Sequence, residues 1–178
     1  MPAYIPSFGM LHLGLLIARL VLGLGLAAHG AQKLFGWFGG AGLAGTANFL
    51  ESAGFYPGRQ MARMAGLGEF VGGLLTALGL FGPIGPAIML AVMLVAMSQN
   101  LGHGFFATDG GIEVALLYCA GGLVLATTGP GAYSLDGLLG LSFFETAELT
   151  AVVLIVALIG AGVVLGRRSR GPAASARR

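Results

Sequence analysis

Charged residues are scarce in this sequence: Lys, Arg, Asp and Glu make up 9% of the 178 residues, whereas apolar residues make up 56%. A soluble globular domain carries roughly 25% charged residues, because its surface faces water. The chain therefore lacks the charge to cover a water-exposed surface. Its composition excludes a soluble domain that folds on its own and favours a helical bundle embedded in lipid.

Cysteine is equally scarce, because Cys119 is the only one in the chain. A single cysteine excludes an internal disulfide, a CxxC redox or zinc motif and an iron–sulfur ligand set. The sequence also has no CxxCH haem motif and no flavin or nucleotide fingerprint. No cofactor is therefore evident from motifs, and no metal is expected.

Long apolar segments are what the sequence has in abundance. A helix needs about 20 apolar residues to cross a hydrocarbon core of about 30 Å. Five segments qualify, at about 11–31, 62–82, 83–101, 112–128 and 147–166. The first ten residues contain no Lys or Arg, whereas a cleavable signal begins with a basic region. We therefore expect the first segment to be retained, and we predict an all-α, polytopic membrane bundle of five spans.

The connections between the predicted spans are of two kinds. The second and third spans are joined at Gly82 and Pro83, so they are expected to form an antiparallel hairpin. The stretch 32–61 contains Trp37 and Tyr56, and these residue types favour the membrane–water boundary. We expect a short interfacial or re-entrant helix near 43–53 within this stretch.

The basic residues predict how the chain is oriented. Five of its nine basic residues lie in the last twelve positions, and Lys and Arg favour the cytoplasmic side. A cytoplasmic C-terminus and five spans place the N-terminus outside. The loop at 32–61 then lies inside, in agreement with Lys33 and Arg59.

A few ionisable residues fall inside the first two spans and are the leading site candidates. Arg19, His29 and Lys33 belong to the first span or its end, and Glu69 belongs to the second. Such groups at membrane depth face a partner or a cavity, because burying them in lipid costs about 2.5–3.5 kcal/mol each. We predict an Arg19–Glu69 pair, or a cluster that includes His29. An ion pair that fixes helix docking and a proton or ligand site both explain this arrangement.

Arg19, Lys33 and Glu69 lie on stripes of helical spacing that also contain glycine. The stripe of the first span is Arg19, Gly23, Leu26, Gly30 and Lys33. The stripe of the second span is Arg59, Arg63, Gly66, Glu69 and Gly73.

A second polar group surrounds the connection between the third and fourth spans. Its members are the secondary candidates Gln99, Asn100, His103, Asp109 and Glu113. Their spacing matches no tight metal motif, whereas Asp and Asn commonly cap helices and turns in glycine-rich segments. Capping and loop hydrogen bonds are the interpretation we favour over a metal site.

Several stretches in order resemble the DoxX family of small bacterial membrane proteins. They are HG and KLFG within 29–36, FLESAGF at 49–55, AGLGEFVGGLL at 65–75, NLGHGFFATDGGIE at 100–113 and GPGAYSLD at 129–136. The resemblance covers about residues 11–139, and Glu69 matches the glutamate of the family's second span. It implies a four-helix core within 1–141. The helix within 142–166 is then an addition, and the basic segment 167–178 is expected to be a disordered cytoplasmic tail.

The resemblance implies an integral membrane subunit, located in the bacterial plasma membrane and linked to a redox or thiol and oxidative-stress complex. Catalysis by the chain alone is not expected, and a quinone is the ligand class compatible with an apolar cleft beside the buried charges. The expected partners are the lipid bilayer, soluble redox proteins on the cytoplasmic face and further copies of the chain, but no nucleic acid. The alternatives are a small proton-coupled transporter or permease that uses Arg19, Glu69 and His29, and a non-catalytic membrane scaffold.

Overall fold

The computed structural model describes residues 8–168, and every regular element in that range is a helix. The α-helices are α1 (Phe8–Phe35), α2 (Gly42–Ser52), α3 (Gly58–Leu78), α4 (Ile84–Asn100), α5 (Glu113–Thr128), α6 (Leu135–Leu139) and α7 (Ala147–Gly166). Short 3₁₀ turns are η1 (Trp37–Gly39), η2 (Leu101–His103), η3 (Ala107–Asp109) and η4 (Ser142–Glu145). The predicted tail from residue 169 onward lies outside the described residues.

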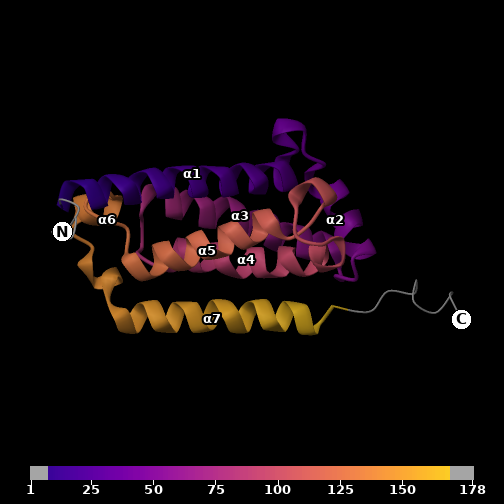
Figure 1. Cartoon of the computed structure of the whole chain (residues 1–178). Coiled ribbons are helices and arrows are strands. Elements are labelled where there is room, and N and C mark those ends of the chain that lie inside the picture. The colour runs from indigo at the N-terminus through magenta and orange to yellow at the C-terminus, as the bar shows by residue number, and fades with distance from the viewer. Residues whose placement is uncertain (1–7, 169–178) are drawn as a thin grey trace, which may run out of the picture.

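The five long helices lie roughly along one axis and alternate in direction (Figure 1). Helix α1 packs most extensively on α3, whereas α4 contacts α3, α5 and α7. The short helix α2 covers the end of the bundle at which α1 and α7 finish (Figure 1). The predicted hairpin of the second and third spans is confirmed as α3 and α4, and the predicted helix near 43–53 is confirmed as α2.

The two glycine-containing stripes face each other between α1 and α3. A Cβ atom added at Gly23 would lie 2.5 Å from the backbone nitrogen of Ala77, and one added at Gly73 would lie 2.5 Å from that of Ala27. A Cβ atom at Gly30 would overlap the backbone of Phe70. Small residues let helix backbones approach in lipid, where no hydrophobic drive brings helices together. The register of α1 on α3 is therefore set by these glycines.

Helix α3 begins and ends four residues earlier than the predicted span at 62–82. It ends at Leu78 because Gly79 has a left-handed backbone conformation with φ of 62° and caps the helix. The sequence-based estimate followed the apolar run into Leu80 and Phe81 and so extended the helix into the turn.

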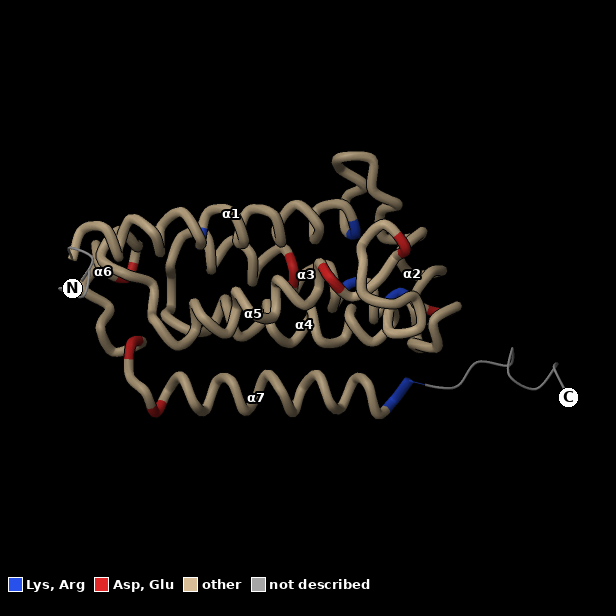
Figure 2. The backbone as a smooth tube through the Cα atoms, viewed as in Figure 1, with Lys and Arg blue, Asp and Glu red and all other residues tan. Residues whose placement is uncertain are grey.

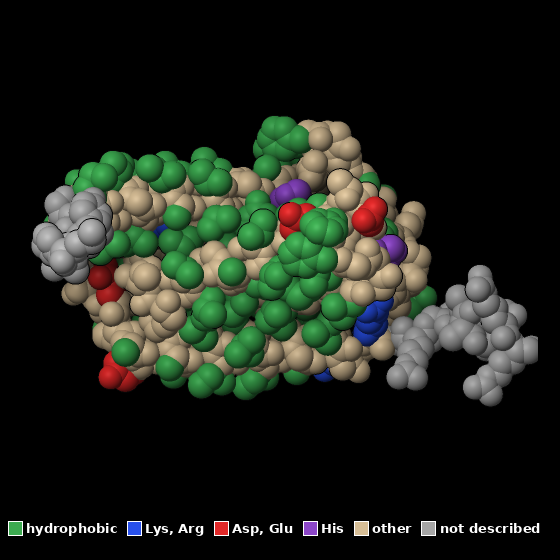
Figure 3. Space-filling model, viewed as in Figure 1, with side chains coloured by type: hydrophobic (Ala, Val, Ile, Leu, Met, Phe, Trp, Pro, Cys, Tyr) green, Lys and Arg blue, Asp and Glu red, His purple; other side chains and the backbone are tan. Residues whose placement is uncertain are grey.

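The outer surface of the bundle is apolar. Large hydrophobic side chains cover the face in Figure 3, and charges are concentrated towards the two ends in Figure 2. Exposed apolar residues include Ile17, Val21, Leu117, Val124 and Ile159. Within residues 8–168, three helices are long and apolar enough to cross a membrane by length and composition, beginning at Phe8, Ile84 and Ala147, and the shorter α5 is also apolar. The protein is a polytopic helical membrane protein.

Candidate functional site

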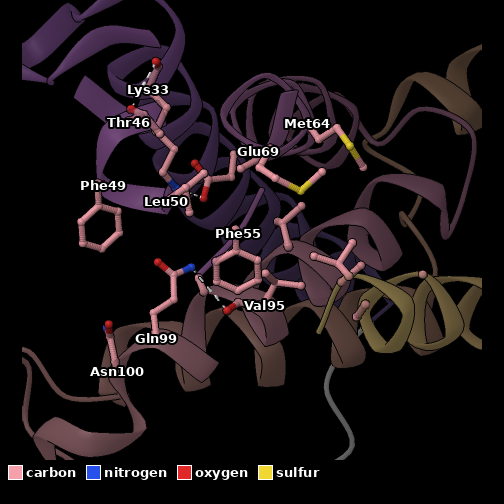
Figure 4. Close-up of a pocket in the computed structure, with 18 residues that line it drawn as sticks. Lys33, Thr46, Phe49, Leu50, Phe55, Met64, Glu69, Val95, Gln99 and Asn100 are labelled. Carbon is pink, nitrogen blue, oxygen red and sulfur yellow. Dashed lines mark hydrogen bonds and ion pairs between the residues drawn. The ribbon is translucent and has the colours of Figure 1, made fainter. Parts of the chain in front are cut away.

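A pocket of about 380 Å³ lies at the end of the bundle that α2 covers. Helices α1, α2, α3, α4 and α7 all contribute to its walls (Figure 4). Its lining is predominantly apolar and includes Phe49, Leu50, Phe55, Met61 and Met64. The polar side chains that reach it are Lys33, Thr46, Glu69, Gln99 and Asn100.

An ion pair between Lys33 and Glu69 belongs to the pocket wall (Figure 4). The Lys33 ammonium donates to Oε1 of Glu69, and Glu69 is only 1% exposed whereas Lys33 is 32% exposed. The close approach of α1 and α3 at Gly30 and Gly66 brings the two side chains together. The second carboxylate oxygen, Oε2 of Glu69, is buried and has no hydrogen-bond partner among the described residues.

The predicted Arg19–Glu69 pair is wrong, because Lys33 takes the place expected for Arg19. Arg19 and Lys33 are fourteen residues apart on α1, which is about 21 Å along a helix. Glu69 lies at the level of Gly30, because the backbone contacts of Gly30 with Gly66 and Phe70 set the register of α1 on α3.

In the described part of the chain, His29 forms no ion pair with Glu69 and has other partners. Its Nδ1 atom is 3.2 Å from the amide oxygen of Gln32, and its ring meets that of Tyr118 edge to face with centroids 6.2 Å apart. Arg19, His29 and Glu69 therefore do not form the directly bonded cluster on which the transporter hypothesis depended.

Arg19 instead holds the opposite end of the bundle together. Its guanidinium donates to the carbonyl oxygens of Ala77 at 3.0 Å and Tyr133 at 2.6 Å. The nearby charge of Asp136 acts on it electrostatically. Arg19 therefore links the end of α3 to the loop that follows α5.

Asp136 is a buried polar residue that the sequence analysis did not single out. Its carboxylate accepts hydrogen bonds from the backbone N–H groups of Phe81, at 2.9 Å, and Gly82, at 2.5 Å. Phe81 has a positive φ of 62°, so this carboxylate stabilises a turn that a phenylalanine rarely adopts. In the sequence, Ser134 followed by Asp136 could have drawn attention to this aspartate. The same pattern is typical of an ordinary helix N-terminus, so it does not reveal the buried contact.

Of the five secondary candidates, two line the pocket and three do not. Gln99 and Asn100 line the pocket with Lys33 and Glu69, whereas the other three lie in the segment between α4 and α5 or at its end. Asn100 donates to the Gly111 carbonyl at 3.3 Å, and Glu113 accepts from the Ala107 N–H at 2.9 Å, so the predicted loop hydrogen bonds are confirmed for these two.

His103 and Asp109 are exposed and lie in η2 and η3. Among the residues the structure describes, no three His, Cys, Asp or Glu side chains lie close enough together to hold a metal ion.

Helix α7 forms one wall of the pocket through Gly160, Ala161 and Val164. Arg168, just beyond its end, donates to the carbonyl oxygens of Ala53 at 2.8 Å and Ser98 at 3.0 Å. The same guanidinium lies over the Phe55 ring, 5.2 Å from the centroid. From the sequence, this arginine indicates only the orientation of the chain, because nothing in a basic tail reveals a specific tertiary contact.

Replacing Arg168 with alanine is expected to loosen α7 without unfolding the bundle. Two hydrogen bonds and a cation–π contact are lost, but the guanidinium is exposed, so we expect about 1 kcal/mol of destabilisation. The midpoint of thermal unfolding in detergent measures this loss. Arg167→Ala is the matched control. Equal midpoints for the two variants would show that the Arg168 contacts contribute nothing to stability.

A family of known proteins matches more than half of the chain. No curated protein and no solved structure matches the chain. A DoxX family model matches residues 14–106, which are 93 of the 178 residues. The matched range includes most of α1, all of α2, α3 and α4, the Lys33–Glu69 pair, Gln99 and Asn100. Helix α7 lies outside the matched region. The chain belongs to the DoxX family.

Proposed function

We propose that this protein is a membrane subunit of a quinone-linked redox complex, and that the pocket at the Lys33–Glu69 pair binds the quinone ring. The observation that carries the proposal is an apolar pocket with a buried ion pair in its wall. Small-molecule sites are typically about 300–1,000 Å³, mainly apolar, and contain a few polar groups that orient the ligand. The volume of about 380 Å³ and the lining of this pocket fit that description.

The lining matches a flat ring with polar substituents and an apolar tail. Phe49 and Phe55 offer aromatic faces, and Met64 offers a polarisable sulfur, all of which pack well on a ring. The side-chain amides of Gln99 and Asn100 and the ammonium of Lys33 supply N–H donors for carbonyl oxygens. The apolar outer surface of the bundle is suited to an isoprenoid tail that lies in the lipid.

The proposed topology places this pocket near the cytoplasmic side of the bacterial plasma membrane. If α1, α3, α4, α5 and α7 each cross once, the N-terminus is outside and the C-terminus inside. Lys33, Arg59, Arg63 and Arg168 then share the cytoplasmic end, as the preference of basic residues for that side requires. Soluble redox proteins that bind this end would be close to the ring, and they would supply the electron chemistry for which the chain has no motif.

Ligand binding tests the proposal directly. The purified full-length chain in detergent is titrated with a short-chain quinone, supplied separately in its oxidised and reduced forms, and the thermal unfolding midpoint is followed. A saturable rise with either form is expected, because a ligand that binds only the folded state stabilises it. Ala65→Phe places a ring in the pocket wall and should abolish the rise. Ala120→Phe, on the exposed face of α5, is the matched control. No saturable rise with either form would refute the proposed site.

The link to a redox complex has a separate test. Affinity purification from native membranes in a mild detergent should recover soluble redox proteins together with this chain. Recovery of the chain alone would contradict the role as an accessory subunit and would leave only a ligand-binding membrane protein.

A further inference from the structure

We infer that the pocket selects a ligand that presents an aromatic hydroxyl group, so that the reduced quinol is bound in preference to the oxidised quinone. The inference rests on the proposed function and specifies the chemistry of the same site. It starts from Oε2 of Glu69, a buried carboxylate oxygen that has no hydrogen-bond partner among the described residues.

The ion pair determines what this oxygen can bind. Lys33 already donates to Oε1, and a carboxylate paired with a cation is an acceptor only. A ligand hydroxyl can donate to Oε2 and satisfy it. A ligand carbonyl at the same place would set two acceptors against each other and leave Oε2 unpaired in an apolar environment.

Two flexible side chains line the same pocket as Glu69. Met61 and Met64 line the same pocket, and methionine changes rotamer easily and adapts to irregular shapes. The inference requires that such side chains move aside so that a ligand hydroxyl reaches the Glu69 carboxylate. The aromatic lining at Phe49 and Phe55 favours a phenolic over an aliphatic alcohol, because two rings gain contact area and favourable edge or stacking geometry.

A matched pair of probes that cannot be oxidised or reduced under the assay conditions tests the inference. 4-Decylphenol and 4-decylanisole share the ring and the alkyl chain. They differ in that the anisole carries a methyl group in place of the hydroxyl hydrogen and so cannot donate a hydrogen bond. We expect the phenol to bind the full-length protein at least about tenfold more tightly than the anisole, because a site built for a hydroxyl discriminates against an analogue that lacks it. 1-Decanol is the aliphatic comparison and should bind more weakly than the phenol.

Two substitutions locate the effect. Glu69→Gln keeps the size of the side chain but adds an N–H donor, so it should remove most of the preference for the phenol. Glu51→Gln makes the same chemical change at a glutamate that does not line the pocket and bonds the Gly58 N–H instead, and it should keep the preference. Equal binding of phenol and anisole to the unmodified protein would overturn the inference while leaving the proposed quinone site intact. Decanol that binds as tightly as the phenol would overturn the assignment to an aromatic hydroxyl. If no probe and neither form of the quinone binds, the inference and the proposed function both fail.

Discussion

Replacing Arg19 with leucine is expected to destabilise the protein by about 3–5 kcal/mol, the range for removing one member of a buried charged network. The substitution leaves the carbonyl oxygens of Ala77 and Tyr133 without the donors they have now. It also leaves the buried Asp136 carboxylate without the nearby positive charge. A denaturation series in mixed detergent micelles, followed by helical circular dichroism, measures the change.

A neutral or stabilising effect of Arg19→Leu would also have a physical explanation. Insertion into lipid favours leucine over arginine by about 2.5–3.5 kcal/mol, so an arginine that was merely tolerated would give a neutral or more stable leucine variant. Arg63→Leu, at an exposed position of α3, controls for this general gain. The double variant Arg19→Leu/Asp136→Asn should lose less stability than the sum of the two single variants, because the second substitution removes a carboxylate charge that the first leaves uncompensated. Losses that simply add would contradict the electrostatic link between the two residues.

The positions of the helices could be predicted from the sequence because apolar runs of about 20 residues have few other structural explanations. The boundaries of α4, α5 and α7 lie within one residue of the predicted spans at 83–101, 112–128 and 147–166. Helix α3 was misplaced by four residues, since hydropathy alone does not mark a left-handed glycine such as Gly79. The residue that meets Glu69 depends on a different feature, the backbone contacts at Gly30 and Gly73 that set the register of α1 on α3.

The charged residues of the site could be found from the sequence, but their partners could not. Lys33 and Glu69 were candidates because ionisable groups near or within spans are uncommon. Which of Arg19, His29 and Lys33 met Glu69 depended on the register of two helices, and an error of one turn selects a different residue. The pocket was beyond sequence reasoning, because it is assembled from five helices, including α2 and α7, that are distant along the chain.

Replacing Gly30 with alanine is expected to have the second large effect, about 3 kcal/mol of destabilisation, the upper end of the usual range for overpacking. A Cβ atom at Gly30 meets the Phe70 backbone and the Gly66 carbonyl oxygen rather than the end of a flexible side chain. The helices must then move apart, because backbone atoms cannot change rotamer to make room. The same separation stretches the Lys33–Glu69 pair, so ligand binding in the pocket should weaken as well as stability.

The control for Gly30→Ala lies in the same helix. Gly14 is exposed, and a Cβ atom there has no neighbour within 4 Å. Gly14→Ala should be neutral or stabilising by up to about 1 kcal/mol, because alanine is the better helix former. Both variants are compared by the denaturation series and by the quinone-induced rise in the unfolding midpoint. If Gly30→Ala matches Gly14→Ala in both assays, α1 and α3 are not packed closely enough for their glycines to set the register. In that case the placement of Glu69 beside Lys33, on which the proposed site depends, would lose its structural basis.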